Sequence, residues 1–510
     1  MRSNRKFLIP LLLFLLSFLL RLALLSRGPY HVDGLALAIE AEKTFNTQQL
    51  HFLFGPGYPL TVLTGALFVG IFKIFSVNDP VMAVNFMSAV FGAACVPLLY
   101  LIVRRMFNGP TAVFSSVALS LLPTFFALST YGKNHTQAIF FLLLGIFFIL
   151  RYRESKNIAA LLWAGLSLGF LGATRIQDML LMLIPLSVLF WRGIDAEHDS
   201  QPTIITKNNL CKTLWALWTI AALTVLLFHV PFLLQSTNNH YQNQFSNFFQ
   251  IGLTANYLGI SPRMLSFSLF LTAREFTVPG IICSLLGLAL LSRDKRRTLF
   301  FLLLWIIVPI AFYGNLRTTV PRFLVISFIP LAIALGYFVS QVIRSRPKTK
   351  YLVVILFSVL ICFPFLKIYP TLSLRHTHEQ LPRFSRWVGQ KTPKNARIIT
   401  ADEALFIEYY ARRSTLPQLH SMTAPVRPEE LAEYKNRVDQ LLSQGIPVYI
   451  IVQGAYQGTI YETFNVFIEN NYDLINVGDK AAEDWHRGEH HWVIGRWTLF
   501  QIAPKASAGH

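Results

Sequence analysis

Charge and cysteine are both scarce in this 510-residue sequence. Only 14% of the residues are charged and four are cysteine, whereas soluble domains carry about 25% charged residues. This low charge excludes a soluble enzyme. The four cysteines lie in or beside apolar segments and form no CxxC pair, which excludes a disulfide framework and a cysteine-ligated metal site. The sequence also lacks a glycine-rich phosphate loop followed by Lys and then Ser or Thr.

Apolar residues are abundant instead, at 53%, with 43 Phe and 9 Trp. So much apolar surface excludes a disordered chain, and uncharged runs such as Phe7–Leu20 and Leu352–Phe365 are typical of bilayer segments. We predict a polytopic α-helical membrane protein with about eleven spans. The predicted spans are 7–25, 81–103, 111–130, 136–150, 157–173, 179–191, 213–235, 278–291, 298–313, 323–342 and 351–369. The first is expected to be a retained span, because no small-residue cleavage pattern follows it.

The net charge of +19 lies entirely before residue 371, in short clusters between the apolar runs. Such clusters are topology signals and not a phosphate-binding face, so no nucleic-acid partner is expected. The apolar stretch Pro59–Phe75 decides the topology. If it does not cross the bilayer, the later basic clusters all face the cytoplasm, as the positive-inside rule requires. We therefore interpret it as a partly embedded or interfacial helix.

This topology divides the chain into two predicted domains. Residues 1–370 form a transmembrane domain, with a first outer loop at 26–80 and a second large outer loop at 236–277. Residues 371–510 carry 15 basic and 15 acidic side chains and alternate predicted strands with helices, which is typical of a small α/β domain. We expect this domain outside the cytoplasm, joined by a connector at 371–395. The predicted strands are 396–400, 448–453, 474–477 and 491–502, with a helix at 428–442.

Few acidic residues occur in the outer loops, which draws attention to Asp33. It stands just after the first span, at the start of a predicted helix. One interpretation is a helix N-terminal cap, and the other is a general base at the mouth of a cavity. The two interpretations are compatible. Two residues earlier, His31 is better explained as a surface or helix-entry residue than as a metal ligand.

Several cationic residues stand at the outer ends of predicted spans, although the positive-inside rule favours cations on the cytoplasmic side. The turn Ser129–Gln137 contains Lys133 and His135, which suit a phosphate or a metal, although a solvated turn explains them too. Arg175 has Asp178 three residues later, so it forms either a local ion pair or a phosphate contact. Further cations stand at Arg317 and Arg322. Together these residues predict an outward pocket with one carboxylate, several cations and apolar walls, which suits a lipid-linked phosphate substrate.

The order of these motifs resembles the C-type membrane glycosyltransferases, in particular the protein O-mannosyltransferase and lipid A aminoarabinose transferase branch. After the first span comes an acidic motif, here His31-Val32-Asp33-Gly34. A Pro-rich helix follows, here opening at Gly55-Pro56-Gly57-Tyr58-Pro59-Leu60. The likeness continues through the basic turn at 100–109, the outer turn at 131–141 and Pro321-Arg322-Phe323. It covers most of residues 1–370, and the tail resembles the outer α/β domain of some members.

This resemblance implies a sugar donor linked to a polyprenyl phosphate and inversion at the anomeric carbon. Asp33 would take the proton of the acceptor hydroxyl. Arg322, followed by Lys133, Arg175 and Arg317, would stabilise the leaving phosphate. His31, Tyr58, Tyr131 and His135 would line the pocket. No cofactor is expected, the acceptor is a lipid, protein or polysaccharide, and the expected location is a multi-pass position in the inner (plasma) membrane.

Three positions depart from the family pattern. Gly34 follows Asp33 where a second acidic residue is usual, His135 replaces an acidic residue of the second outer loop, and Asn85 stands where Arg is common. These departures leave open an inactive relative that acts as a scaffold. A transporter is a further alternative, although it predicts internal repeats and paired charges near the bilayer midplane.

Overall fold

The computed structural model divides into two compact units. The helical unit comprises Met1–Ser26 and Leu37–His376, and the α/β unit comprises Arg27–Ala36 and most of the chain from Thr377 onward. The residues that the structure describes are 5–53, 57–192, 207–235, 261–315, 320–377, 380–401, 404–419, 426–453, 461–484 and 493–505.

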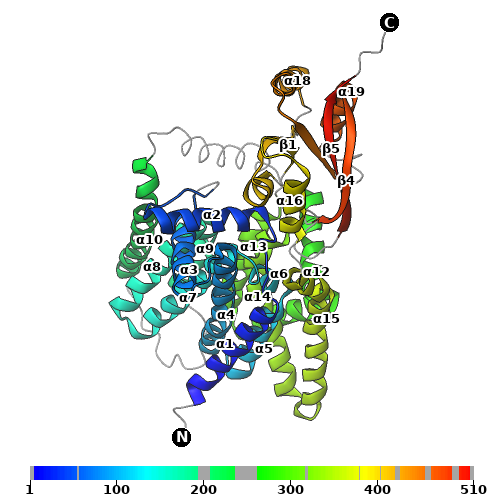
Figure 1. Cartoon of the computed structure of the whole chain (residues 1–510). Helices are drawn as coiled ribbons and strands as arrows, with labels where there is room; N and C mark the ends of the chain where they lie inside the picture. Colours follow the sequence, from blue (N-terminus) through cyan, green and yellow to red (C-terminus); the bar gives the residue numbers. More distant parts are fainter. Residues whose placement is uncertain are drawn as a thin grey trace. The chain divides into compact units, whose positions relative to one another are not determined.

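Long apolar helices build the helical unit (Figure 1). They are α1 (Arg5–Ala23), α2 (Val32–Thr47), α3 (Pro59–Ile74), α4 (Pro80–Met106), α5 (Gly109–Leu121), α6 (Pro123–Leu128), α7 (His135–Ser155), α8 (Ile158–Thr174), α9 (Ile176–Arg192), α10 (Lys207–Gln235), α12 (Pro262–Asp294), α13 (Arg296–Tyr313), α14 (Pro321–Ser345) and α15 (Lys350–Thr377), with a 3₁₀ turn at Pro347–Thr349. The first turn of α2 belongs to the α/β unit and the rest of α2 to the helical unit. Seven helices of the described chain are long and apolar enough to cross a membrane, and five shorter helices are also apolar.

Each predicted span contains a helix, but one span and one predicted loop differ in detail. The predicted span 111–130 is two helices, α5 and α6, because Pro123 has no N–H to continue the ladder after Leu122. The predicted outer loop 236–277 is partly helical, because α12 already begins at Pro262 and is kinked at Thr277 (φ 63°, ψ 162°). Residues 236–260 lie outside the described residues.

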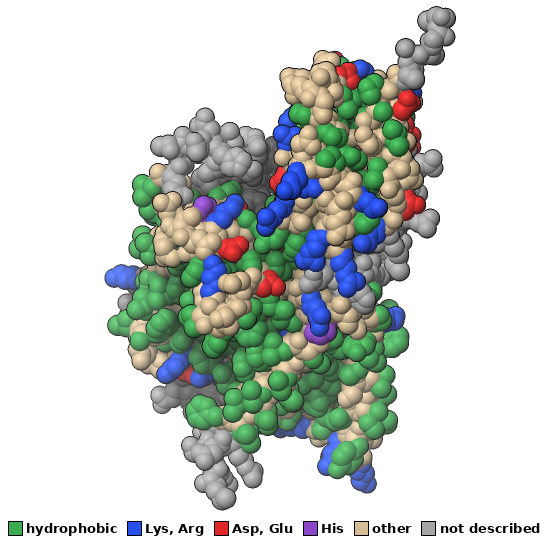
Figure 2. Space-filling view, viewed as in Figure 1, with side chains coloured by type: hydrophobic (Ala, Val, Ile, Leu, Met, Phe, Trp, Pro, Cys, Tyr) green, Lys and Arg blue, Asp and Glu red, His purple; other side chains and the backbone are tan. Residues whose placement is uncertain are grey.

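Helix α14 is the most buried of the long helices. Of its apolar 18-residue stretch, 89% is buried, whereas the corresponding share for α15 is only 22%. Figure 1 shows α4, α5 and α14 side by side. Glycines allow this close approach, because a Cβ at Gly336 would lie 2.3 Å from Ser115 Oγ and 2.6 Å from its backbone nitrogen. The outer helices instead expose large apolar side chains, such as Ile355 and Leu366 of α15. Hydrophobic side chains accordingly cover the helices in Figure 2, as expected of a surface that faces lipid.

The α/β unit has a five-stranded sheet in the order β2-β1-β3-β5-β4. Strand β1 (Arg397–Thr400) is parallel to both β2 (Ser414–Pro417) and β3 (Val448–Gln453), while β5 (Val493–Pro504) is antiparallel to β3 and β4 (Tyr472–Asp484). The helical elements are α16 (Gln380–Lys391), α17 (Ala404–Phe406) with a π-helical turn at Ile407–Ala411, α18 (Pro428–Ser443) and α19 (Glu462–Asn471).

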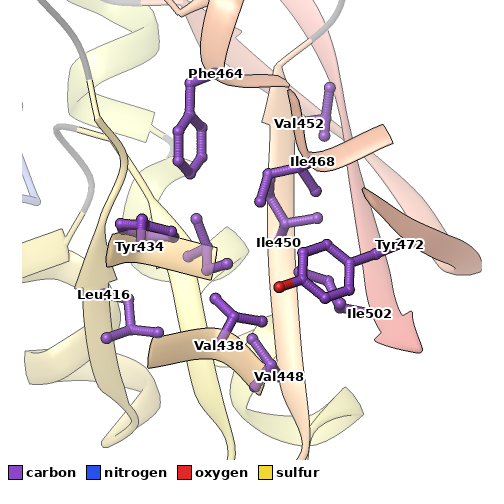
Figure 3. Packing of buried hydrophobic residues seen from close by; sticks show 11 residues of the cluster. Leu416, Tyr434, Val438, Val448, Ile450, Val452, Phe464, Ile468, Tyr472 and Ile502 are labelled. Atoms are coloured by element: carbon purple, nitrogen blue, oxygen red, sulfur yellow. The ribbon is translucent and has the colours of Figure 1, made fainter. Parts of the chain in front are cut away.

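Figure 3 shows the apolar core of this sheet, where Tyr434 and Val438 of α18 and Phe464 and Ile468 of α19 surround Ile450 of β3. Elsewhere α16 packs on β4, where a Cβ at Gly478 would lie 3.2 Å from the Trp387 ring.

The predicted connector 371–395 is mostly helical. It contains the end of α15, which runs to Thr377, and the whole of α16. Pro382 falls in the first turn of α16, where its missing N–H costs no hydrogen bond. Strand β2 was not predicted, because only one of its four residues, Leu416, is buried and its sequence has no apolar run.

We predict that Gly336→Ala lowers the free energy of unfolding by about 1–3 kcal/mol, because the added methyl overlaps the backbone of Ser115. Thermal unfolding of the detergent-solubilised full-length chain measures this loss. Gly109→Ala is the matched control, since a Cβ there meets nothing within 4 Å. Equal losses of melting temperature in the two variants would contradict close packing of α5 on α14.

Candidate functional site

The turn between α6 and α7, predicted as an outer turn at Ser129–Gln137, is not the solvated turn considered from the sequence. Every residue of this turn is buried, and Lys133 and His135 are each only 4% exposed. The turn is therefore part of the interior of the helical unit. Burial of a charged lysine is costly, and such residues are retained where they have a function.

Helix α4 holds this turn in place. Asn85 accepts a hydrogen bond from the Gly132 N–H (2.6 Å) and donates one to the Ser26 carbonyl (2.8 Å). One turn further along α4, the Ser88 hydroxyl accepts from the Lys133 N–H (3.1 Å) and donates to the Lys133 carbonyl (3.2 Å). Asn85, at first a departure from the family pattern, thus joins the exit of α1 to the buried turn.

Arg175 lies between α8 and α9 and is 3% exposed. Its Nε donates to Asp178 (2.7 Å), and its other nitrogens donate to Asn134 and to the Tyr313 hydroxyl (3.4 Å each). Tyr313 in turn donates to the second oxygen of Asp178 (2.5 Å). Burial alone would lower the pKa of the Arg175 guanidinium, but Asp178, Tyr313 and Tyr58 together raise it. The local ion pair considered from the sequence therefore exists, and it connects α9, α13 and the buried turn.

An aromatic stack continues from this network to Arg322. The Tyr313 ring stacks on Phe323 with centroids 5.6 Å apart, and Phe323 stacks on His135 at 6.4 Å. The guanidinium of Arg322, which is half-buried at the start of α14, lies 5.3 Å from the centroid of the Phe323 ring. Two of the predicted site residues, His135 and Arg322, thus meet on the same ring.

Sequence analysis missed one cation of this region, Arg375. It was counted with the predicted tail, but it lies in the last turns of α15, within the helical unit, and is 3% exposed. Its guanidinium carbon lies 5.2 Å from the centroid of the buried Tyr131 ring. The next residue, His376, contacts the Leu25 carbonyl (2.8 Å), at the exit of α1. The only sequence signal for Arg375 is a basic residue at the end of an apolar helix.

Asp33 and His31 lie in the short segment that belongs to the α/β unit. Helix α2 begins at Val32, so Asp33 is in its first turn, where the helix dipole favours a carboxylate. His31 Nδ1 accepts from the Asp33 backbone N–H (3.1 Å) and lies 3.4 Å from the Asp33 carboxylate. The Asp33 side chain is 25% exposed, so solvent or substrate can reach it.

The remaining predicted site residues are Tyr58 and Arg317. Tyr58 is 7% exposed and has a left-handed backbone (φ 47°) just before α3, and its hydroxyl interacts electrostatically with Arg175. Arg317 lies outside the described residues. Among the residues that the structure describes, no group of three His, Cys, Asp or Glu side chains is placed to hold a metal ion.

Residues 61–234 match the family model for dolichyl-phosphate-mannose-protein mannosyltransferase. Over 346 residues, the chain is 24% identical to the undecaprenyl phosphate-alpha-4-amino-4-deoxy-L-arabinose arabinosyl transferase 1 of Pseudomonas fluorescens, covering 65% of this chain and 60% of that protein. Transferase 2 of the same organism is 25% identical over 276 residues and is covered to 43%. The chain thus matches less than two thirds of the length of these relatives.

Solved structures share the fold over nearly the whole chain. ArnT from Cupriavidus metallidurans bound to undecaprenyl phosphate has a TM-score of 0.62 at 13% identity, with 100% of both chains covered. An Archaeoglobus fulgidus oligosaccharyltransferase has a TM-score of 0.59 at 14% identity, covering 95% of this chain and 74% of the other. The chain therefore shares the fold of these two solved proteins.

We predict that Asp178→Ala lowers the free energy of unfolding by about 3–5 kcal/mol, because it leaves the buried Arg175 guanidinium without its carboxylate. The melting temperature of the solubilised full-length chain measures the loss. The double variant Arg175→Met/Asp178→Leu removes both charges and is expected to recover most of it. A double variant as unstable as Asp178→Ala would contradict the ion-pair explanation.

Proposed function

We propose that the chain is an inverting glycosyltransferase that moves a sugar from a polyprenyl phosphate to an acceptor hydroxyl on the extracytoplasmic face of the membrane. The main supporting observation is a cluster of cationic and aromatic side chains within this fold, in which Lys133, His135 and Arg375 are buried and Arg322 is half-buried. The names of the relatives support the donor class, since two are transferases acting on an undecaprenyl phosphate-linked sugar. The solved ArnT with bound undecaprenyl phosphate supports the same class of ligand.

Arg175 and Arg322 have different neighbours in the structure. Asp178 neutralises Arg175, so that guanidinium serves better to position the Asn134 side chain than to bind a phosphate. Arg322 instead rests on the face of Phe323 and is half-buried. A guanidinium presents several N–H donors in a plane, which suits two phosphate oxygens at once. We therefore assign the donor phosphate first to Arg322, followed by Lys133.

The proposed reaction is a single displacement. The acceptor oxygen attacks the anomeric carbon, its proton passes to the Asp33 carboxylate, and the bond from carbon to phosphate oxygen breaks on the opposite side. The leaving polyprenyl phosphate gains one negative charge, which Arg322 and Lys133 stabilise more strongly than they stabilise the donor. Cationic side chains supply this stabilisation, so the proposal requires no metal ion.

The remaining predicted pocket residues receive supporting roles. His31 Nδ1 accepts a hydrogen bond from the Asp33 backbone N–H (3.1 Å) and so helps to fix the backbone that carries the carboxylate. Tyr131 and His135 provide buried aromatic walls, and Tyr58 interacts with Arg175 beside Asn134. In this proposal the acceptor is a lipid, a protein or a polysaccharide. The membrane is the inner (plasma) membrane.

We predict that Asp33→Asn reduces turnover about 10²–10⁴-fold, because asparagine cannot accept the acceptor proton. A deletion strain complemented with each variant, followed by mass spectrometry of its glycans and lipid-linked sugars, provides the readout. The matched control is Glu42→Gln, another acidic residue of α2. Asn suits a helix start as well as Asp does, so the melting temperature should not change. Full complementation by Asp33→Asn would instead support a scaffold without catalysis.

We also predict that Arg322→Gln abolishes the stabilisation of the chain by added undecaprenyl phosphate. The measurement is the shift of melting temperature on titration with the lipid phosphate, which follows binding to the folded state. Arg263→Gln is the control, since Arg263 is an exposed cation of α12. An unchanged shift of melting temperature in Arg322→Gln would contradict the assignment of the phosphate to Arg322.

A further inference from the structure

A polar cavity lies toward the other end of α14 from Arg322. Its volume is about 150 Å³, well above the 10–15 Å³ that a single water needs. It lies between the junction of α4 and α5, the junction of α12 and α13, and the last turns of α14. Its lining includes Phe107, Asn108, Asp294, Lys295, Tyr337 and Arg344. At 1.5 Å per helical residue, Tyr337 and Arg344 stand roughly 20–30 Å from Arg322, so this cavity is separate from the proposed sugar-transfer site.

One side of the cavity favours a phosphate. Lys295 donates to the Met106 carbonyl (3.0 Å), and its ammonium lies 5.3 Å from the centroid of the Phe107 ring. Arg344 is exposed and lines the same cavity. Lys295 is also the residue before α13, which has 18 residues and no side-chain cap. The positive end of a helix dipole and two cations thus converge on one small volume.

The other side of the cavity favours a cation. The Tyr337 hydroxyl donates to one oxygen of the exposed Asp294 carboxylate (2.8 Å). A carboxylate accepts about four hydrogen bonds, so Asp294 retains capacity for an ammonium group. The Phe107 and Tyr337 rings, with centroids 5.1 Å apart, supply an apolar wall between the charged groups.

This arrangement of charges is complementary to a molecule that carries both a phosphodiester and an ammonium. The cavity also lies at the ends of helices whose sides are apolar and exposed, such as Leu286 of α12 and Phe300 of α13. Acyl chains can lie along such helix surfaces while a headgroup enters the cavity. We propose that this cavity binds the headgroup of a zwitterionic phospholipid of the phosphoethanolamine class. The phosphodiester contacts Lys295 and Arg344, and the ammonium contacts Asp294.

Native mass spectrometry of the full-length chain, incubated with equal amounts of phosphatidylethanolamine and phosphatidylglycerol, tests this assignment. The unmodified chain is expected to retain the ethanolamine lipid about tenfold better, the fold-change of one charge-assisted hydrogen bond. Asp294→Asn is expected to equalise the two lipids, because it removes the partner of the ammonium. Arg344→Gln is expected to lower retention of both, because it weakens the phosphate contact.

The control is Arg346→Gln, an exposed arginine two residues beyond Arg344 that does not line the cavity. It should retain lipid as the unmodified chain does. Equal retention of both lipids by the unmodified chain and by Asp294→Asn would overturn the proposal. Soluble phosphoethanolamine provides a further arm. If it raises the melting temperature as much as the lipid does, the ligand is a free phosphate ester and the lipid assignment fails. None of these measurements depends on sugar transfer.

Discussion

The two hydrogen bonds of the Asn85 side chain are the constraint on which the helical unit most depends. They tie the Ser26 carbonyl, where the chain leaves α1, to the Gly132 N–H in the buried turn before α7. The amide of asparagine both donates and accepts, so one side chain satisfies two buried backbone groups that water does not reach. This contact fixes where the chain leaves α1 toward Asp33, and it fixes the turn that carries Lys133 and His135.

From this turn, a chain of polar and aromatic contacts extends to neighbouring helices. Asn134 receives a hydrogen bond from Arg175, and the Arg175 network reaches Tyr313 on α13. Tyr313 stacks on Phe323 beside Arg322 on α14. The cluster is therefore assembled from elements far apart in the sequence. In the proposed reaction such an assembly would favour charge stabilisation, because donors that are already oriented need no reorganisation when the leaving group departs.

The positions of the helices could be predicted because long uncharged runs have few alternatives in a membrane protein. The break before Pro123 was missed, since apolar composition continues through it, and the start of α12 at Pro262 was missed within the predicted loop 236–277. In the α/β unit, β3 was predicted with its observed bounds, whereas the helix α16 was mistaken for a connector because it contains Pro382.

Within the candidate site, the pair of Arg175 and Asp178 was visible as an (i, i+3) spacing, but its partner Tyr313 was not, because 135 residues separate it from Asp178. Arg375 was missed for a similar reason, as only the fold brings it to Tyr131. Asn85 appeared to be a departure from the family pattern, and only its hydrogen bonds explain why a short amide suits that position. Long-range contacts of this kind produce no recognisable spacing pattern in the sequence.

The central claim is that the buried turn and the start of α14 hold the phosphate of a polyprenyl lipid. An experimental structure of the full-length chain in a lipid nanodisc with a bound polyprenyl phosphate tests it most directly. The account predicts the phosphate within hydrogen-bond distance of Arg322 and Lys133, with the Asp33 carboxylate facing the position that the sugar would occupy. A phosphate bound away from both cations, or an Asp33 side chain directed away from the lipid, would contradict it.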